Sequence, residues 1–242
     1  MAIYLAALTV ASTAIGGLLA LKAKDRFHLV LGLSAGLLLG LVGFDLLPEV
    51  FKNSGTTGGV PTVSIAILIG FLLLHISERR FGGHEPVDSE YSHDHTHGSI
   101  AGGIGAVAMA GHVFLDGAAL GLAFKVSNKL GFAVFIALLV HAFSDGLNTV
   151  SMLVKSGNWK STSKMLLIVD AIARIGGAAL GTYVTFEGNF VTIYLALFSG
   201  IVIYVATSHI LPEAHSHHPS RWTFAATGVG VIAMWLIIGA LG

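Results

Sequence analysis

Residues 112–148 read HVFLDGAALGLAFKVSNKLGFAVFIALLVHAFSDGLN, and this stretch decides the fold. One phrase occurs in it twice, as HVFLDG from His112 to Gly117 and as HAFSDG from His141 to Gly146. Each copy lies within a long apolar run, and the short polar segment KVSNK between the runs predicts two adjacent antiparallel helices. A His and an Asp four residues apart share one helix face. The stretch therefore predicts two imidazoles and two carboxylates that face one point.

The composition of the whole chain indicates a membrane protein. Of its 242 residues, 54% are hydrophobic and only 11% are charged, and the mean hydropathy is +0.81. A soluble domain has about 25% charged residues, so this chain has too few charges to cover a water-facing surface. Its net charge is zero, which predicts no nucleic-acid partner. It has no cysteine, which excludes disulfides and thiolate metal ligands.

A transmembrane helix needs about 20 mainly apolar residues, and eight segments of the chain meet this requirement. We expect an all-α polytopic membrane protein with a single transmembrane domain over residues 1–242. Its eight transmembrane helices are predicted at 2–21, 27–51, 60–78, 99–124, 130–154, 163–184, 190–213 and 222–241.

Residues 79–98 connect the third and fourth spans, and their polar composition predicts a disordered loop. His84, His93, His95 and His97 lie in this loop among acidic residues. A His-rich tract is a compositional signal of metal binding. The loop is therefore expected either to collect ions on its side of the membrane or to be an idle linker.

Lys and Arg residues in the loops predict the orientation. One set of alternate loops contains nine of them, whereas the other contains only Lys52, Lys125 and Lys129. The richer set is expected in the cytoplasm, together with the His-rich loop. With eight spans, both termini then lie outside. We expect an integral protein of the cell membrane.

A short phrase is repeated near the ends of the second and seventh spans. The segment from Asp45 to Glu49 reads DLLPE, and the segment from His209 to Glu213 reads HILPE. These spans run in opposite directions, so the two phrases lie near opposite faces of the membrane. A 3+2+3 arrangement, with spans 1–3 and 6–8 as an inverted repeat, would produce this pattern. The first phrase then marks an outer entrance and the second an inner exit.

His112, Asp116, His141 and Asp145 are the candidate ligands of a metal ion. Ionisable side chains are costly inside a membrane and therefore indicate a functional site. Imidazoles and carboxylates suit a divalent transition metal such as zinc, and two carboxylates neutralise a dication. Hydrogen bonding between neighbouring helices is the alternative explanation for these four residues.

Further polar residues lie close to these candidates in the sequence. Ser144 and Asn148 fall on or beside the same face of the fifth span, where they would complete the coordination or orient a ligand. Asp170 and Arg174 form another pair four residues apart, in the sixth span.

Taken together, these residues resemble the prokaryotic type of the ZIP (Zrt/Irt-like protein) family of divalent-metal transporters. The similarity covers nearly the whole chain, and its most specific parts are HVFLDG and the segment LFSGIVIYVATSHILPEAH at residues 197–215. The resemblance implies that the four candidate ligands form a transport site and that one helix group moves against the other. It also implies uptake toward the cytoplasm. His and carboxylate ligands admit zinc, cadmium, iron, cobalt and manganese; we expect zinc.

Three departures from the family pattern point to one ion rather than two. Val113 and Ala142 follow the two histidines at positions where family members often have a polar or acidic ligand. A loose alignment of AIARIGGA places Arg174 where many members have a Glu on the sixth helix. We hypothesise that the guanidinium of Arg174 occupies the place of a second metal, with Asp170 or Asp116 neutralising it.

An intramembrane metal hydrolase of the ceramidase-like kind is the alternative function, with Asp116 or Asp145 as a general base beside a metal-activated water. The chain contains no HExxH motif, and the repeated LPE phrase has no role in a hydrolase. A metal sensor that transports nothing is a third possibility. We therefore predict a transporter and not an enzyme, without a catalytic cofactor. Its expected partners are the metal ion and the bilayer. Stripes of small residues such as Gly32, Gly36 and Gly40 permit close helix packing and leave a homodimer open.

Overall fold

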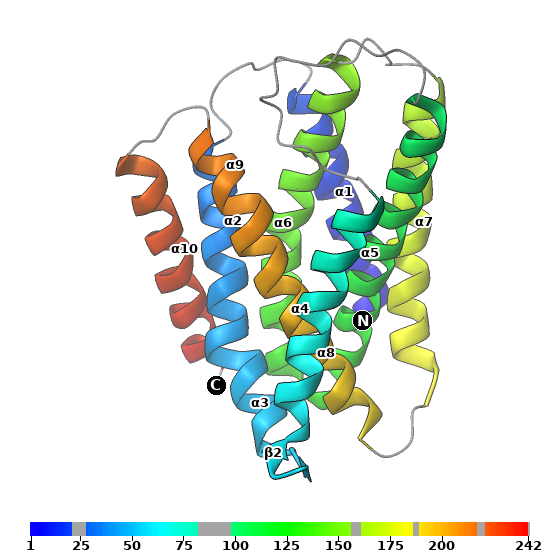
Figure 1. Ribbon diagram of the computed structural model, residues 1–242. Helices are drawn as coiled ribbons and strands as arrows, with labels where there is room; N and C mark the ends of the chain where they lie inside the picture. Colours follow the sequence, from blue (N-terminus) through cyan, green and yellow to red (C-terminus); the bar gives the residue numbers. More distant parts are fainter. Residues whose placement is uncertain (21–27, 82–97, 156–160, 186–188, 217–220, 242) are drawn as a thin grey trace.

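The computed structural model describes residues 1–20, 28–81, 98–155, 161–185, 189–216 and 221–241 (Figure 1). Within these ranges the chain is almost entirely helical. The helices are α1 (Ala2–Ala20), α2 (His28–Leu41), η1 (Val42–Leu46), α3 (Leu47–Lys52), α4 (Thr62–Phe81), α5 (Gly98–Val126), α6 (Asn128–Lys155), α7 (Ser161–Tyr183), α8 (Phe190–Tyr204), η2 (Val205–Ile210), α9 (Leu211–Ser216) and α10 (Arg221–Ala240). His84, His93, His95 and His97 lie outside the described residues, as does the side chain of Asn148.

Each of the eight apolar segments forms a helix at its predicted place, with ends that differ by at most a few residues. The second and seventh segments each consist of three consecutive elements, α2–η1–α3 and α8–η2–α9. After α3, β1 (Thr56–Thr57) pairs antiparallel with β2 (Val60–Pro61). Gly58 and Gly59 form the turn with positive φ angles of 59° and 82°, which glycine adopts at little cost.

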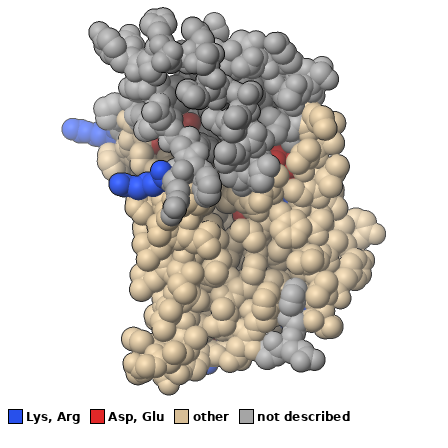
Figure 2. Space-filling model, turned by 45° about the vertical axis from the view of Figure 1, so that its right-hand side comes forward, with Lys and Arg blue, Asp and Glu red and all other residues tan. Residues whose placement is uncertain are grey.

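Several helices have the length and composition of membrane spans. Among the described residues, five segments are long and apolar enough to cross a bilayer, namely Ala2–Leu19, His28–Lys52, Asn128–Gly146, Phe190–His215 and Arg221–Ala240. Large apolar side chains such as Trp235 and Leu68 are exposed, as expected of a surface that faces lipid. On the face drawn in Figure 2, charged side chains are confined to the upper part and the lower edge of the described surface.

Small residues bring four pairs of helices into close contact, α5 with α7, α1 with α6, α2 with α10 and α4 with α8. In each pair a methyl group added to one glycine would lie between 2.0 and 2.1 Å from a carbonyl oxygen of the other helix; these glycines are Gly117, Gly146, Gly36 and Gly200. Only glycine permits such an approach. The pairs α2 with α10 and α5 with α7 lie near opposite edges of the bundle (Figure 1).

The long helices that contain α2 and α8 are interrupted at matching places. Val42–Leu46 and Val205–Ile210 are π-helical, so that the amide of Leu47 donates to the carbonyl of Val42 and the amide of Leu211 to that of Ala206. Pro48 and Pro212 follow directly, and proline cannot donate the regular helical hydrogen bond. A proline normally kinks or breaks a helix, and here each one is accommodated by a widened turn that retains a continuous helix.

Candidate metal site

Two histidines and one carboxylate meet between α5 and α6. His112 and Asp116 come from α5 and His141 from α6, and one ligand atom of each lies within 4.8 Å of the others. His141 and Asp116 are buried, with 4% and 1% of their surfaces exposed. The helices are neighbours because Ser127 alone separates α5 from α6. The repeated His-xxx-Asp-Gly phrase predicts two imidazoles and two carboxylates at one point, and the closest set contains both imidazoles and one of the carboxylates.

The distances between these atoms suit a small tetrahedral ion. The Nε2 atoms of His112 and His141 lie 3.4 Å apart. Nε2 of His112 lies 3.7 Å from Oδ2 of Asp116, and Nε2 of His141 lies 3.5 Å from Oδ1 of Asp145. In a tetrahedral zinc site with bonds of about 2.0–2.1 Å, neighbouring ligand atoms are about 3.3 Å apart. The two imidazole nitrogens are already near this spacing, and the ligand atoms of His112, Asp116 and His141 all lie within 4.8 Å of one another, so zinc binding would require the carboxylate to move closer.

Asp145 lies beside this group but not within its closest set. It contacts His141 on its own helix, and its other oxygen faces Arg174 of α7. The Nη2 atom of Arg174 is 3.6 Å from Oδ2 of Asp145, and its Nη1 atom is 3.8 Å from Oδ2 of Asp116. The guanidinium thus lies between the two carboxylates, one from each helix. Among the described residues, Arg174 forms ion pairs with Asp116 and Asp145. Asp116 was one of the two carboxylates expected to neutralise it. The second carboxylate is Asp145 and not the expected Asp170.

The backbone of α7 holds Arg174 in this place. A methyl group added to Gly117 would lie 2.1 Å from the carbonyl oxygen of Arg174, and one added to Gly177 would lie 2.0 Å from that of Phe114. The two glycines let α5 and α7 touch on both sides of the Asp116 level. Arg174, with 2% of its surface exposed, can therefore extend only a short way before it meets the carboxylates.

A small cavity opens beside the histidines. It is lined by His112, Asp116 and His141 together with apolar side chains of α2, α6, α8 and η2, namely Leu38, Leu138, Val202 and Val205. About 10 Å³ is open in it, enough for about one water-sized occupant. The polar side of the cavity is formed by the candidate ligands, and the remaining walls are apolar.

The other predicted site residues have different surroundings. The hydroxyl of Ser144 donates to the carbonyl of Val140 one turn earlier at 3.3 Å, so it is engaged with its own helix. Asp170 is buried on α7, and its Oδ1 atom has no hydrogen-bond partner among the described residues. It lies within electrostatic range of Asp145, Arg174 and His112.

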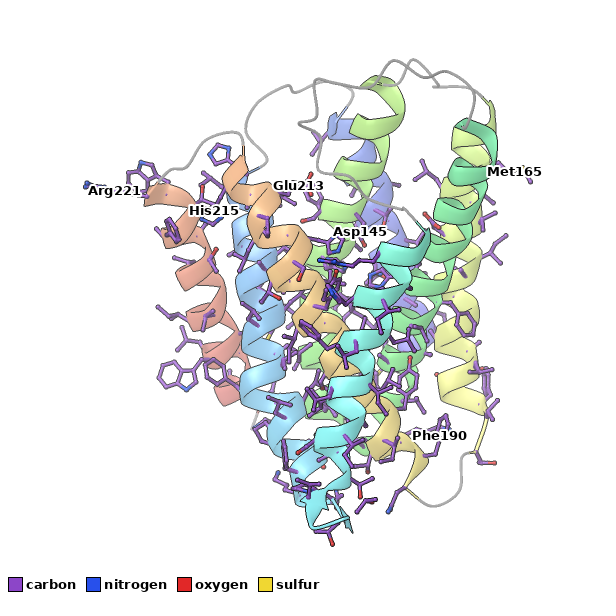
Figure 3. The ribbon with its side chains drawn as sticks, viewed as in Figure 1. Asp145, Met165, Phe190, Glu213, His215 and Arg221 are labelled. Atoms are coloured by element: carbon purple, nitrogen blue, oxygen red, sulfur yellow. The ribbon has the colours of Figure 1, made fainter. Side chains whose placement is uncertain are left out.

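The predicted entrance and exit residues lie away from the central group. Asp45 is in η1 and Glu49 in α3, where Glu49 accepts from Lys52 at 3.3 Å. His209 is in η2, and its ring lies 5.5 Å from that of Tyr204. In Figure 3, Asp145 lies inside the bundle whereas Glu213 lies near the upper end of α9. These residues therefore flank the centre along the helix axes rather than joining it.

Tyr194 is a residue that the sequence did not single out. Its hydroxyl donates from α8 to the carbonyl of Leu115 at 2.8 Å, directly before Asp116. This bond links the helix that carries His209 to the helix that carries two of the candidate ligands. A tyrosine in the second turn of an apolar span was the available signal, since its hydroxyl requires a partner when buried.

Comparison with known proteins agrees with this geometry. A family model described as the ZIP zinc transporter matches residues 82–238, more than half of the chain. Zinc transporter YKE4 of Saccharomyces cerevisiae is 27% identical over 230 residues, covering 82% of this chain and 66% of that protein. Zinc transporter ZIP9-A of Xenopus laevis is 25% identical over 194 residues, covering 74% and 62% respectively.

A shorter match is found to zinc transporter ZIP4 of Rattus norvegicus, which is 30% identical over 131 residues, covering 52% of this chain and 20% of that protein. The chain thus spans between a fifth and about two thirds of the length of these relatives. The matched range of this chain contains both copies of the His-xxx-Asp-Gly phrase, Arg174 and the second LPE phrase. The chain therefore belongs to the ZIP zinc transporter family.

Proposed function

We propose that the protein transports a divalent transition metal, zinc first, across the cell membrane toward the cytoplasm. One ion binds between α5 and α6 to His112, Asp116 and His141, with Asp145 as the fourth ligand. The observation that carries this proposal is the convergence of two imidazoles and a carboxylate, with ligand atoms within 4.8 Å of one another, between two adjacent helices. Cadmium, iron, cobalt and manganese are further candidates, because the same ligands accept them.

The path and the architecture belong to the same proposal. All eight helices cross the membrane, in a 3+2+3 arrangement with both termini outside. Asp45 and Glu49 admit the ion from outside, and it leaves past His209 and Glu213. The inverted repeat is supported by matching features, because each long interrupted helix has a contact glycine, then a π turn, then Leu-Pro-Glu. The helix pairs match too, α5–α7 with α6–α1 and α2–α10 with α8–α4.

Transport requires that the centre opens to each side in turn. The ligands all lie on α5 and α6, which pack with α7 and α1, whereas both mouths are built on the helices of the other group. We propose that the group formed by α1, α5, α6 and α7 moves against the group formed by α2–α3, α4, α8–α9 and α10. The hydrolase alternative has no observation in its favour, since family membership and the two mouths both point to transport. In this proposal the protein is not an enzyme and needs no catalytic cofactor.

Metal flux into proteoliposomes tests the function. Purified protein should carry zinc into vesicles, and His112→Ala and Asp145→Ala should each reduce the flux to the level of empty vesicles, because each removes a ligand of the ion. The five candidate metals compared in the same vesicles give the preference.

His28→Ala is the matched control. His28 begins α2 and lies ten residues, or about 15 Å along the helix, from Leu38 in the cavity wall, so its variant should retain flux. Monodisperse elution of every variant in detergent establishes folding. Wild-type flux in both folded site variants would contradict the proposed site, and absence of metal flux in the wild type would contradict transport.

A further inference from the structure

Arg174 is a buried cation at the place where a cation would be transported. Its guanidinium bridges carboxylates of two different helices through two different nitrogens, at 3.8 Å and 3.6 Å. Both distances are longer than a normal hydrogen bond. The Nη1 atom of Arg174 and the Oδ2 atoms of Asp116 and Asp145 have no hydrogen-bond partner among the described residues. The guanidinium is therefore held by charge and not by close pairing.

One oxygen atom is shared between the guanidinium and the metal position. Oδ2 of Asp116 lies 3.8 Å from Nη1 of Arg174 and 3.7 Å from Nε2 of His112. This oxygen belongs to the carboxylate that completes the closest set of ligand atoms with the two histidines. A metal at the centre would draw the carboxylate toward the imidazoles and away from the guanidinium.

We propose that Arg174 is a resident counter-ion that competes with the transported metal for Asp116 and so sets the affinity and the release of that metal. This inference rests on the proposed transport site. While no metal is bound, the guanidinium neutralises Asp116 and Asp145 and keeps two like charges from repelling across the interface of α5 and α6. When the metal binds, Asp116 coordinates it, and the guanidinium keeps its ion pair with Asp145.

The net charge of the site is zero when one divalent metal ion is bound. Asp116, Asp145 and Asp170 provide three negative charges, and Arg174 provides one positive charge, so that a single dication makes the site neutral. Asp170 lies one helical turn before Arg174 on α7 and within its electrostatic range. It gives the displaced guanidinium a second carboxylate to face. The contact of α7 with Gly117 prevents the arginine from leaving the site altogether.

Zinc affinity of purified Arg174 variants tests the competition. Arg174→Gln removes the charge at similar size, and zinc should bind it at least about tenfold more tightly than the wild type, since a cation within about 4–6 Å changes the proton affinity of a carboxylate by one to three log units. The maximal flux should fall while the zinc concentration for half-maximal flux decreases, because tighter binding slows release. Arg174→Lys keeps the charge but not the planar fork and should stay near wild-type affinity.

The readouts separate this inference from the site itself. A merely structural role of Arg174 would weaken zinc binding when it is replaced, so equal or weaker binding by folded Arg174→Gln overturns the inference. His112→Ala should lose zinc binding in both the wild-type and the Arg174→Gln background. Zinc binding retained by His112→Ala would instead contradict the proposed transport site. The competition between Arg174 and the metal would then be tested by the wild-type structures with and without cadmium.

A measurement on the wild type decides the matter if Arg174→Gln does not fold. Experimental structures with and without cadmium should differ at one contact, with the distance from Nη1 of Arg174 to Oδ2 of Asp116 longer in the cadmium-bound protein. The contact from Nη2 to Asp145 should persist. An unchanged or shorter distance to Asp116 in the presence of bound cadmium overturns the competition.

Discussion

Val113 and Ala142 follow the two histidines of the centre, and their side chains are fully apolar and buried, with 2% and 0% of their surfaces exposed. Neither can offer an atom to a second ion. We propose that these two side chains and the cation of Arg174 limit the centre to one metal. In this proposal the number of bound ions is determined by three residues that are not ligands.

We predict one ion per protein at this centre in the wild type. Anomalous scattering from cadmium-soaked crystals should give a single peak between α5 and α6. Arg174→Glu removes the cation and adds a carboxylate, so a second peak is expected in that variant. Two peaks in the wild-type centre would show that Arg174 does not exclude a second ion.

The sequence predicted well which residues lie near the centre. It predicted less well which of them contact one another. Spacing by four places His112 with Asp116, and His141 with Asp145, on one face of each helix. It does not give the rotation of one helix against the next, so it missed that Asp145 stands outside the closest set. The position of Arg174 between both carboxylates depends on how closely α7 packs against Gly117. That distance between two helices cannot be read from residue spacing along one helix.

Helix limits followed from the apolar runs, because a span must satisfy its backbone polar groups internally. Two local features did not follow. The π turns add one residue to a helical turn without changing the hydrophobic pattern, so only Pro48 and Pro212 indicated a break. The hairpin at Thr56–Pro61 lies between the second and third spans, and its second strand, Val60–Pro61, occupies the first two residues of the span predicted at 60–78.

The close contact of α5 with α7 predicts that alanine substitutions at Gly117 of α5 and at Gly176 of α7 have unequal effects. Gly117→Ala would place a methyl group 2.1 Å from the carbonyl of Arg174, whereas Gly176→Ala meets nothing within 4 Å. The first should separate the helices, lower stability by about 1–3 kcal/mol and reduce zinc flux by displacing Arg174.

The second is the control and should be neutral or slightly stabilising, because alanine favours helix over glycine. Thermal unfolding in detergent and vesicle flux measure the two effects. Equal stability and flux in both variants would mean that α5 and α7 are not in backbone contact.

On the scale of the molecule, the helix pairs divide the described helices into a group that carries the candidate ligands and a group that carries the residues of both proposed mouths. Alternating access between these mouths predicts opposite changes at matching positions. The chain contains no cysteine, so Glu49→Cys and Glu213→Cys each introduce a single thiol, near one mouth and the other.

We expect zinc to lower the rate of modification by a membrane-impermeant maleimide at one of these thiols and to raise it at the other. Inside-out and right-side-out vesicles give access to each face. In the His112→Ala background, the rates of maleimide modification at both thiols should be the same with and without zinc. Parallel changes at both thiols would be inconsistent with a reciprocal opening, and would favour a pore open to both sides at once.

The π turns also determine how these two helices tolerate a change in length. Each residue of an α-helix advances the chain by about 100° around the axis, so a deletion in a regular helix turns everything beyond it onto another face. A deletion within Val42–Leu46 would instead remove the surplus residue and leave a regular helix. Leu47–Lys52, and with it Glu49, would keep its present face, and the contact of Gly36 with α10 would stay in place. A deletion of one residue is thus expected to be tolerated at this turn, whereas the same deletion elsewhere in the helix would turn Glu49 away from its present direction.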